Sequence, residues 1–224
     1  MYRIYESKLQ SWIDYSKKAL LIYGARQVGK TFLIREMLKR NHISFCEYNL
    51  VERGDILDYL REENNAAEIS SQLALFSDVA LTEKESVIFL DEIQCYPDIV
   101  TKIKFLVDEG RYRFILSGSN LGVELKGIKS IPIGYVESWQ MVPMNFEEFV
   151  LASGISASAV SHIKECYIDK RPVADIIHKK MIQAFYYYLV VGGMPAVVNT
   201  FNESHSLDRI QTEQTNILNQ YRLR

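Results

Sequence analysis

The chain has 224 residues, of which 48% are hydrophobic and 24% are charged, and its formal net charge is −2. This composition is that of a globular protein with a buried core, so it excludes wholesale disorder, and the charge provides no general basic field for nucleic acid. No apolar run approaches the roughly 18–20 residues that span a bilayer, and no signal-peptide segment follows Met1, so we expect a cytoplasmic protein without a membrane partner.

Helical patterns alternate with short apolar runs over the first 142 residues. Apolar residues recur at helical spacing in the segments 2–16, 32–40, 55–82 and 99–109. The runs that are typical of strands lie at 19–23, 43–50, 87–90, 113–116 and 134–142. Several of them are apolar without alternation, as in a parallel sheet buried on both faces. We expect Asp98 to cap the fourth helix and Gly110 to end it. The alternation predicts a three-layer α/β fold with a parallel five-stranded sheet.

The pattern changes near residue 143, after which only helices and turns are expected. Asn145 and Glu148 have the spacing of a capping box that opens a helix, and Gly192-Gly193-Met194-Pro195 separates two later helices. We therefore expect an α/β core at 1–142 and an all-α appendage at 143–224.

The last helical segment carries an apolar stripe formed by Ile210, Ile217, Leu218 and Tyr221. No helix stop signal precedes Arg224. A helix that stays amphipathic needs a surface to pack against. We therefore expect the protein to continue beyond this residue.

Residues 24–31 read GARQVGKT and match the P-loop pattern G-x-x-x-x-G-K-[ST]. The glycines allow successive backbone N–H groups to turn inward around a phosphate, and the following helix directs its positive N-terminus at the same anion. We expect Lys30 to reach the β- and γ-phosphates of ATP and the Thr31 hydroxyl to bind Mg²⁺. An accidental match is disfavoured because an apolar strand precedes the loop and an amphipathic helix follows it. The expected nucleotide-binding residues are Gly24, Ala25, Arg26, Gln27, Val28, Gly29, Lys30, Thr31 and Phe32.

Asp91 and Glu92 end the third apolar run. The carboxyl ends of parallel strands line the ligand crevice, so we expect Asp91 to hold Mg²⁺ as a Walker-B aspartate. Glu92 is the candidate general base for the attacking water. At the end of the fourth run, Ser117 or Ser119, or less readily Asn120, is a candidate sensor of the γ-phosphate, and a polar turn is the alternative interpretation. The candidate catalytic residues are therefore Lys30, Glu92, Ser117 and Ser119.

Three segments together resemble the bacterial and archaeal AAA-like P-loop ATP-binding proteins: GARQVGKT at 24–31, FLDEIQ at 89–94 and LSGS at 116–119. PMNFEEF at 143–149 and GGMP at 192–195 resemble later landmarks of that family. The resemblance implies an AAA-like core in which a central strand separates the P-loop strand from the Walker-B strand. It also implies a helical segment of winged-helix-like form. In such proteins a nuclease-like C-terminal domain, absent here, usually follows. Nucleic acid is an expected partner only through that domain.

The chain departs from this resemblance at Gly134-Tyr135, where many relatives have Gly-Arg. If that arginine stabilises charge on the γ-phosphoryl group, its absence predicts slow turnover, since an arginine finger raises the rate by roughly 10³–10⁵. The nearest substitutes in the sequence are Arg26, Arg111 and Arg113. A partner subunit is the other possible source of the cation.

The leading hypothesis is an ATPase that hydrolyses ATP with Mg²⁺ to drive or signal a conformational change. One alternative is a switch that binds ATP with negligible hydrolysis. Another is a P-loop kinase, which the adjacent Asp91 and Glu92 disfavour because that pair suits water as the nucleophile. A homo-oligomer and a separate protein partner are both open, and the physiological role does not follow from the sequence.

Overall fold

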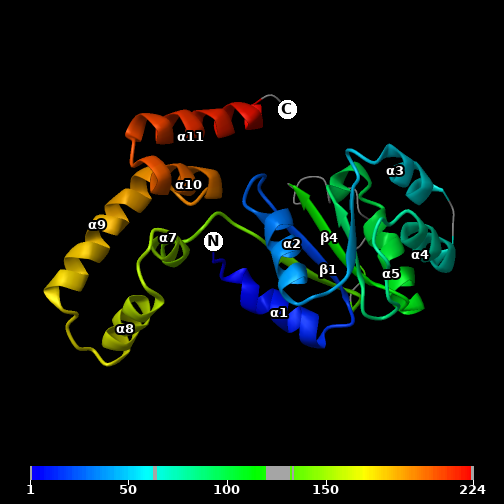
Figure 1. Cartoon of the computed structure of the whole chain (residues 1–224), viewed down its shortest axis with the longest axis horizontal. Coiled ribbons are helices and arrows are strands. Elements are labelled where there is room, and N and C mark those ends of the chain that lie inside the picture. Colours follow the sequence, from blue (N-terminus) through cyan, green and yellow to red (C-terminus); the bar gives the residue numbers. More distant parts are fainter. Residues whose placement is uncertain (1, 63–64, 120–131, 133, 223–224) are drawn as a thin grey trace. The chain divides into compact units, whose positions relative to one another are not determined.

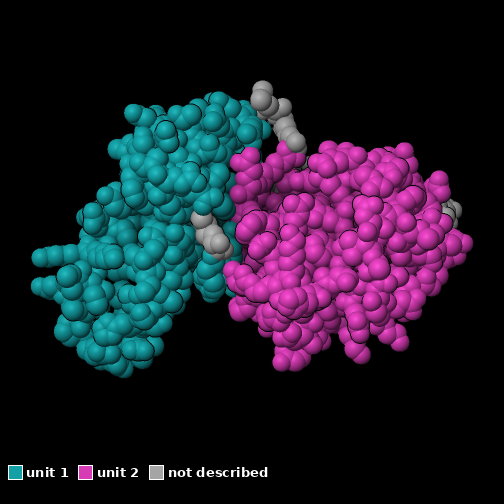
Figure 2. All heavy atoms as spheres, in the orientation of Figure 1, with its two compact units in different colours: residues 1–4, 143–224 teal, residues 5–142 magenta. Residues whose placement is uncertain are grey.

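The computed structural model describes residues 2–62, 65–119, 132 and 134–222. The chain divides into two compact units, residues 5–142 and residues 1–4 together with 143–224 (Figure 2). Each unit has a hydrophobic core of its own. The unit that carries the P-loop is called the core unit below, and the other is called the helical unit.

The core unit is built on a parallel five-stranded sheet with the order β2-β3-β4-β1-β5. Its strands are β1 (Ala19–Gly24), β2 (Phe45–Asn49), β3 (Val87–Asp91), β4 (Arg113–Ser119) and β5 (Val136–Gln140). β4 therefore lies between β1, which leads into the P-loop, and β3, which ends at Asp91. The predicted α/β class and the central strand are confirmed.

Helices cover both faces of this sheet (Figure 1). They are α1 (Tyr5–Tyr15), α2 (Lys30–Arg40), α3 (Gly54–Arg61), α4 (Ala66–Leu75) and α5 (Ile99–Glu109), with a short 3-10 helix, η1 (Ile93–Cys95). The apolar sides of α3, α4 and α5 share one core with strand residues such as Leu21 and Leu90. Successive strand residues point to opposite faces. The buried Leu20 and Ile22 of β1 therefore face the layer formed by α1 and α2.

The segment expected to be helical from 55 to 82 forms two helices and then an irregular stretch. α4 ends at Leu75. Beyond it, the Ser77 hydroxyl donates to the Val79 carbonyl (2.7 Å) and accepts from the Val79 N–H (3.1 Å). Such local side-chain bonds compete with the helical backbone pattern. The prediction that residues 55–82 are mostly helical is confirmed, but the helical part ends at Leu75.

The expected side-chain cap at Asp98 is also wrong. Asp98 precedes α5, but its side chain makes no capping hydrogen bond and its backbone is already helical. The preceding turn provides the acceptor instead, because the Val100 N–H, an amide that a cap would serve, donates to the Pro97 carbonyl (3.1 Å). At the other end, Gly110 ends the helix with φ 69°, as predicted.

The helical unit contains α7 (Phe146–Ala152), α8 (Ala157–Ile168), α9 (Asp175–Val191), α10 (Pro195–Ser204) and α11 (Leu207–Arg222). Residues 141–222, all of them described, form no strand, so they lack the β-wing of a winged-helix segment. Ile210 and Ile217 of the C-terminal stripe are buried in this unit, whereas Leu218 is 57% exposed. Within the described ranges, no helix has both the length and the apolar content required to cross a membrane.

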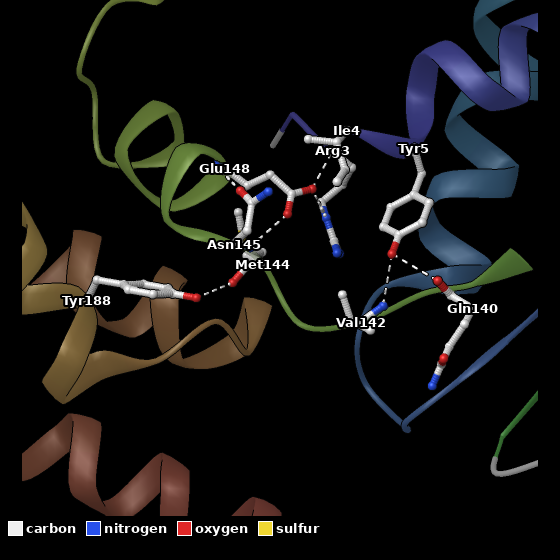
Figure 3. Close-up of polar contacts among 9 residues, drawn as sticks. All are labelled: Arg3, Ile4, Tyr5, Gln140, Val142, Met144, Asn145, Glu148 and Tyr188. Atoms are coloured by element: carbon white, nitrogen blue, oxygen red, sulfur yellow. Dashed lines mark hydrogen bonds and ion pairs between the residues drawn. The ribbon is translucent and has the colours of Figure 1, made fainter. Parts of the chain in front are cut away.

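α7 begins at the predicted capping box. The Asn145 side chain accepts from the Glu148 N–H, and the Glu148 carboxylate accepts from the Asn145 N–H, both at 2.9 Å. The same carboxylate accepts from Arg3 Nε and from the Ile4 N–H, both at 2.8 Å (Figure 3). Residues 1–4 therefore group with the helical unit and not with the core to which the sequence analysis assigned them.

Candidate nucleotide-binding site

The P-loop connects the carboxyl end of β1 to the first turn of α2. Three of its residues have positive φ: Gly24 (150°), Gln27 (61°) and Gly29 (95°). Glycine at two of these positions avoids the Cβ clash of such a backbone, whereas Gln27 adopts it at some cost in strain. The first bond within α2 runs from the Leu33 N–H to the Gly29 carbonyl (2.9 Å), and no side chain caps this helix. The amides before Leu33 therefore point out of the helix N-terminus, the usual phosphate position in P-loops.

Lys30 lies inside the loop and is only 7% exposed. Its Nζ donates to the carbonyls of Gly24 (3.1 Å) and Ala25 (2.9 Å). Burial lowers the pKa of the Lys30 ammonium, and the carboxylates of Glu92 and Asp91 oppose that shift. An anion bound in the loop would offset the cost of burying this cation, so the surroundings of Lys30 fit a phosphate.

The Asp91 carboxylate joins the P-loop helix to the ends of two strands. Its Oδ2 accepts from the Thr31 hydroxyl (2.8 Å), and its Oδ1 accepts from the Ser117 hydroxyl and from the Glu92 N–H (2.9 Å). The two residues expected to hold Mg²⁺, Thr31 and Asp91, therefore meet at one edge of the sheet. Hydroxyl and carboxylate oxygens are the ligands that Mg²⁺ prefers, so this donor set fits that ion.

A sequence profile of the AAA domain matches residues 16–150. This range is more than half of the chain, and it includes all five strands, the P-loop and Asp91. The chain belongs to the AAA domain family. As an AAA domain, the core unit is a P-loop nucleotide-binding fold of the ATPase type.

Two solved structures resemble this AAA domain protein. One is a structure of Drosophila ORC bound to DNA. The match covers 98% of this chain and 68% of that chain, with a TM-score of 0.52 and 13% sequence identity. The Aeropyrum pernix ORC1 protein in complex with DNA covers 67% of this chain, with a TM-score of 0.44 and 14% identity. The chain spans only about half of the latter protein, 48% of its length. No curated protein matches the sequence. At these identities the likeness concerns the fold alone.

One of the three arginines considered as substitutes lies at the P-loop edge of the AAA domain. Arg26 Nε donates to the Ser119 hydroxyl (3.2 Å) at the carboxyl end of β4. Arg113 begins β4 at the opposite end, where it donates to the Trp12 carbonyl (2.8 Å), and Arg111 lies just before that strand. Arg26 is therefore the one of the three that is placed to meet a nucleotide.

Tyr135 also lies far from the P-loop of its own AAA domain. It directly precedes β5, whose first residue, Val136, pairs with Ala19. Ala19 is the first residue of β1 and Gly24 is its last, so about five residues, or roughly 16 Å, separate position 135 from the loop. An arginine at position 135 would therefore begin far from the P-loop of its own core unit.

The two serines predicted as sensors have different surroundings. Ser117 is wholly buried with its hydroxyl on Asp91, so it orients that carboxylate. Ser119 lies beside Arg26 of the loop, at the carboxyl end of β4. Asn120 lies outside the described residues.

The side chains of the expected nucleotide-binding segment differ in exposure. Val28 is wholly buried, so only its backbone is available to a ligand, whereas Gln27 is exposed. Phe32, in the first turn of α2, is 57% exposed. Its ring is open to solvent, and its expected contribution is the backbone amide.

Gln94 is a residue of this region that the sequence analysis did not single out. Its Nε2 donates to Glu92 Oε2, and its Oε1 accepts from the Ser119 N–H (3.1 Å). The contact depends on a sharp turn at Glu92, which has φ 59° although it is not glycine. The one available signal was a polar side chain two residues after the acidic pair, and that signal does not show that the chain folds back.

Replacing Gly24 by alanine is expected to destabilise the core unit by about 1–3 kcal/mol. A Cβ at Gly24 would lie 2.0 Å from the Met141 carbonyl oxygen, a backbone atom that cannot move by itself. Met141 is also held to β1 by its N–H, which donates to the Tyr23 carbonyl (2.7 Å). Gly54→Ala is the matched control, because nothing lies within 4 Å of the added Cβ. Urea denaturation measures both variants, and wild-type stability of Gly24→Ala would contradict the close approach.

Proposed function

We propose that the core unit binds ATP with Mg²⁺ at the P-loop and hydrolyses it. The observation that carries this proposal is the 2.8 Å hydrogen bond from the Thr31 hydroxyl to Asp91 Oδ2. It brings together the two candidate metal ligands, which come from separate segments of the chain. Membership of the AAA domain family supports the same function.

Phosphate binding is assigned to Lys30 and to the backbone amides at the start of α2. The metal is assigned to Thr31 and Asp91, and Ser117 keeps the Asp91 carboxylate oriented through its hydrogen bond. When bound, Mg²⁺ would neutralise charge on the β- and γ-phosphate oxygens. Ser119 and Arg26, which contact each other at the P-loop edge of the sheet, are assigned to sensing the terminal phosphate.

Glu92 is assigned the role of general base. The oxygen of a water molecule attacks the γ-phosphorus, the bond to the β-bridging oxygen breaks, and ADP leaves with the electron pair. The proton of the water passes to the Glu92 carboxylate. Glu92 directly follows Asp91 and is partly exposed, so its carboxylate lies near the metal ligands but is accessible to water.

The isolated chain is expected to turn ATP over slowly. Tyr135 stands where many relatives have an arginine, and Arg111 and Arg113 are at the opposite end of β4. An arginine supplied by a second subunit or by a protein partner would raise the rate by roughly 10³–10⁵. A turnover number that rises with protein concentration would identify a homo-oligomer as the source.

We further propose that hydrolysis in residues 5–142 drives or signals a movement of the helical appendage at 143–224. The chain passes between the two units only twice, at residues 4–5 and 142–143. Two short covalent connections allow one unit to respond to the other without unfolding of either core.

Magnesium is expected to be required for turnover. The protein should release phosphate from ATP with Mg²⁺, and an excess of EDTA should stop the release. In water enriched in ¹⁸O, the released phosphate should carry one new ¹⁸O atom. Normal ATP binding without phosphate release would favour the switch, and transfer of the phosphate to an acceptor would favour the kinase. Failure to bind ATP in any condition would overturn the proposed function.

A further inference from the structure

The turn after Asp91 folds the chain back toward Glu92. β3 ends at Asp91, Glu92 adopts the left-handed conformation, and η1 follows at once. Ile93 is wholly buried in the core of the unit, and the Cys95 N–H donates to the Glu92 carbonyl (3.1 Å). Packing and backbone hydrogen bonding therefore hold this turn in place, and the turn brings the Gln94 side chain beside Glu92.

The Gln94 amide uses both of its ends. Its Nε2 donates to the Glu92 carboxylate, and its Oε1 accepts from the Ser119 N–H at the end of β4 (3.1 Å). The Ser119 hydroxyl in turn accepts from Arg26 Nε (3.2 Å). A continuous path of hydrogen bonds therefore runs from Glu92 through Gln94 and Ser119 to the P-loop.

We infer that Gln94 is a positioning residue that sets the Glu92 carboxylate relative to the end of β4 and couples it to Arg26 and Ser119. This inference rests on the proposed function, since it concerns the same hydrolysis. The nitrogen donor and the oxygen acceptor of a carboxamide lie in one rigid plane. A shift of the Ser119 N–H therefore also moves the Gln94 Nε2 group that donates to the Glu92 carboxylate. Binding of a terminal phosphate at Arg26 and Ser119 then places the base. A base without this bridge rotates freely, and a misplacement of 1 Å can lower a rate by roughly 10²-fold.

Two substitutions separate the two halves of the bridge. Gln94→Met removes the donor and the acceptor at nearly constant length. Gln94→Glu keeps the acceptor for the Ser119 N–H but places a second carboxylate beside Glu92. Both variants are expected to lower kcat by roughly 10–100-fold and to leave the KM for ATP within about twofold of wild type. Gln211→Met, on an exposed face of α11, is the control for the substitution itself.

A second measurement needs no nucleotide. Amide hydrogen exchange at Ser119 should be faster in Gln94→Met, because its acceptor is lost, and unchanged in Gln94→Glu, where the acceptor is kept. In a Glu92→Gln background, Gln94→Met should lower the residual rate no further, because the base that it positions is already absent.

The outcomes distinguish this inference from the function on which it rests. Wild-type protein without turnover overturns the proposed function, and this inference with it. Turnover that falls in Glu92→Gln but persists in Gln94→Met overturns the positioning role alone. Unchanged exchange at Ser119 in Gln94→Met overturns the bridge whatever the rates are. A raised KM with unchanged kcat would instead place Gln94 in ATP binding and also overturn the positioning role.

Discussion

Replacing Glu92 by glutamine is expected to lower kcat by about 10²–10⁴-fold and to leave the affinity for ATP within about twofold of wild type. The amide has nearly the same shape as the carboxylate, but it cannot take a proton from the attacking water. The contacts assigned to binding, such as Lys30 Nζ in the loop and the Thr31–Asp91 pair, do not involve the Glu92 side chain. Phosphate release measures the rate, and calorimetry with a non-hydrolysable ATP analogue measures the affinity.

Two control variants make this result specific. Lys30→Ala should lose the affinity for the ATP analogue that Glu92→Gln keeps, because the Lys30 ammonium is the cation inside the loop. Glu85→Gln removes an exposed carboxylate that precedes β3 and should leave both quantities unchanged. Wild-type turnover in Glu92→Gln would mean that another group accepts the proton, and the role of Glu92 would be refuted.

The parts of the site that could be predicted from the sequence are those formed by short contiguous segments of the chain. The P-loop spacing at 24–31 is imposed by a backbone that must wrap a phosphate, so it can be recognised without a structure. Asp91 ends an apolar strand, and the parallel arrangement then places it at the same edge as the loop. The central position of β4 between β1 and β3 came from the family resemblance and not from any local pattern.

The parts that were not predictable depend on where the chain turns and on which distant residues meet. The link from Gln94 to Ser119 requires the left-handed turn at Glu92, and glutamate has no intrinsic preference for that conformation. Tyr135 was interpreted by its identity, whereas its meaning depends on its place before β5, at the far end of the strands. Asp98 had the right identity for a cap, but the turn before it had already satisfied the amide that a cap would serve.

The contact between Arg3 and Glu148 shows the same limit most clearly, because the two residues are 145 positions apart in the sequence. Glu148 was correctly predicted to take part in a capping box. Nothing local indicates that its carboxylate also receives a cation from the start of the chain. The consequence is that a residue near the N-terminus stabilises the helical unit and not the unit that follows it in sequence.

Replacing Arg3 by alanine is expected to lower the free energy of unfolding of the helical unit by about 3–5 kcal/mol. The two side chains are 5% and 1% exposed, and Nε lies 2.8 Å from Oε1. Without the guanidinium, the charge of Glu148 stays buried. Of the partners described for its carboxylate, the Ile4 and Asn145 N–H groups are then the ones that remain. The large effect reflects this stranded charge, since an intact buried pair adds little over an apolar pair of the same size. Urea denaturation followed by circular dichroism measures the loss.

Arg40→Ala is the matched control, because Arg40 forms an ion pair of similar length with Glu6 (2.7 Å) but is 60% exposed. Solvent already screens that pair, so its loss should cost less than about 1 kcal/mol. The decisive comparison is Arg3→Ala in a Glu148→Gln background, where no charge remains to be stranded and the cost should be markedly smaller. Equal costs in the two backgrounds would assign the loss to packing of the arginine stem and refute the electrostatic origin. A smaller cost with glutamine would show that the N-terminal residues are held to the helical unit chiefly by the charge of a single capping glutamate.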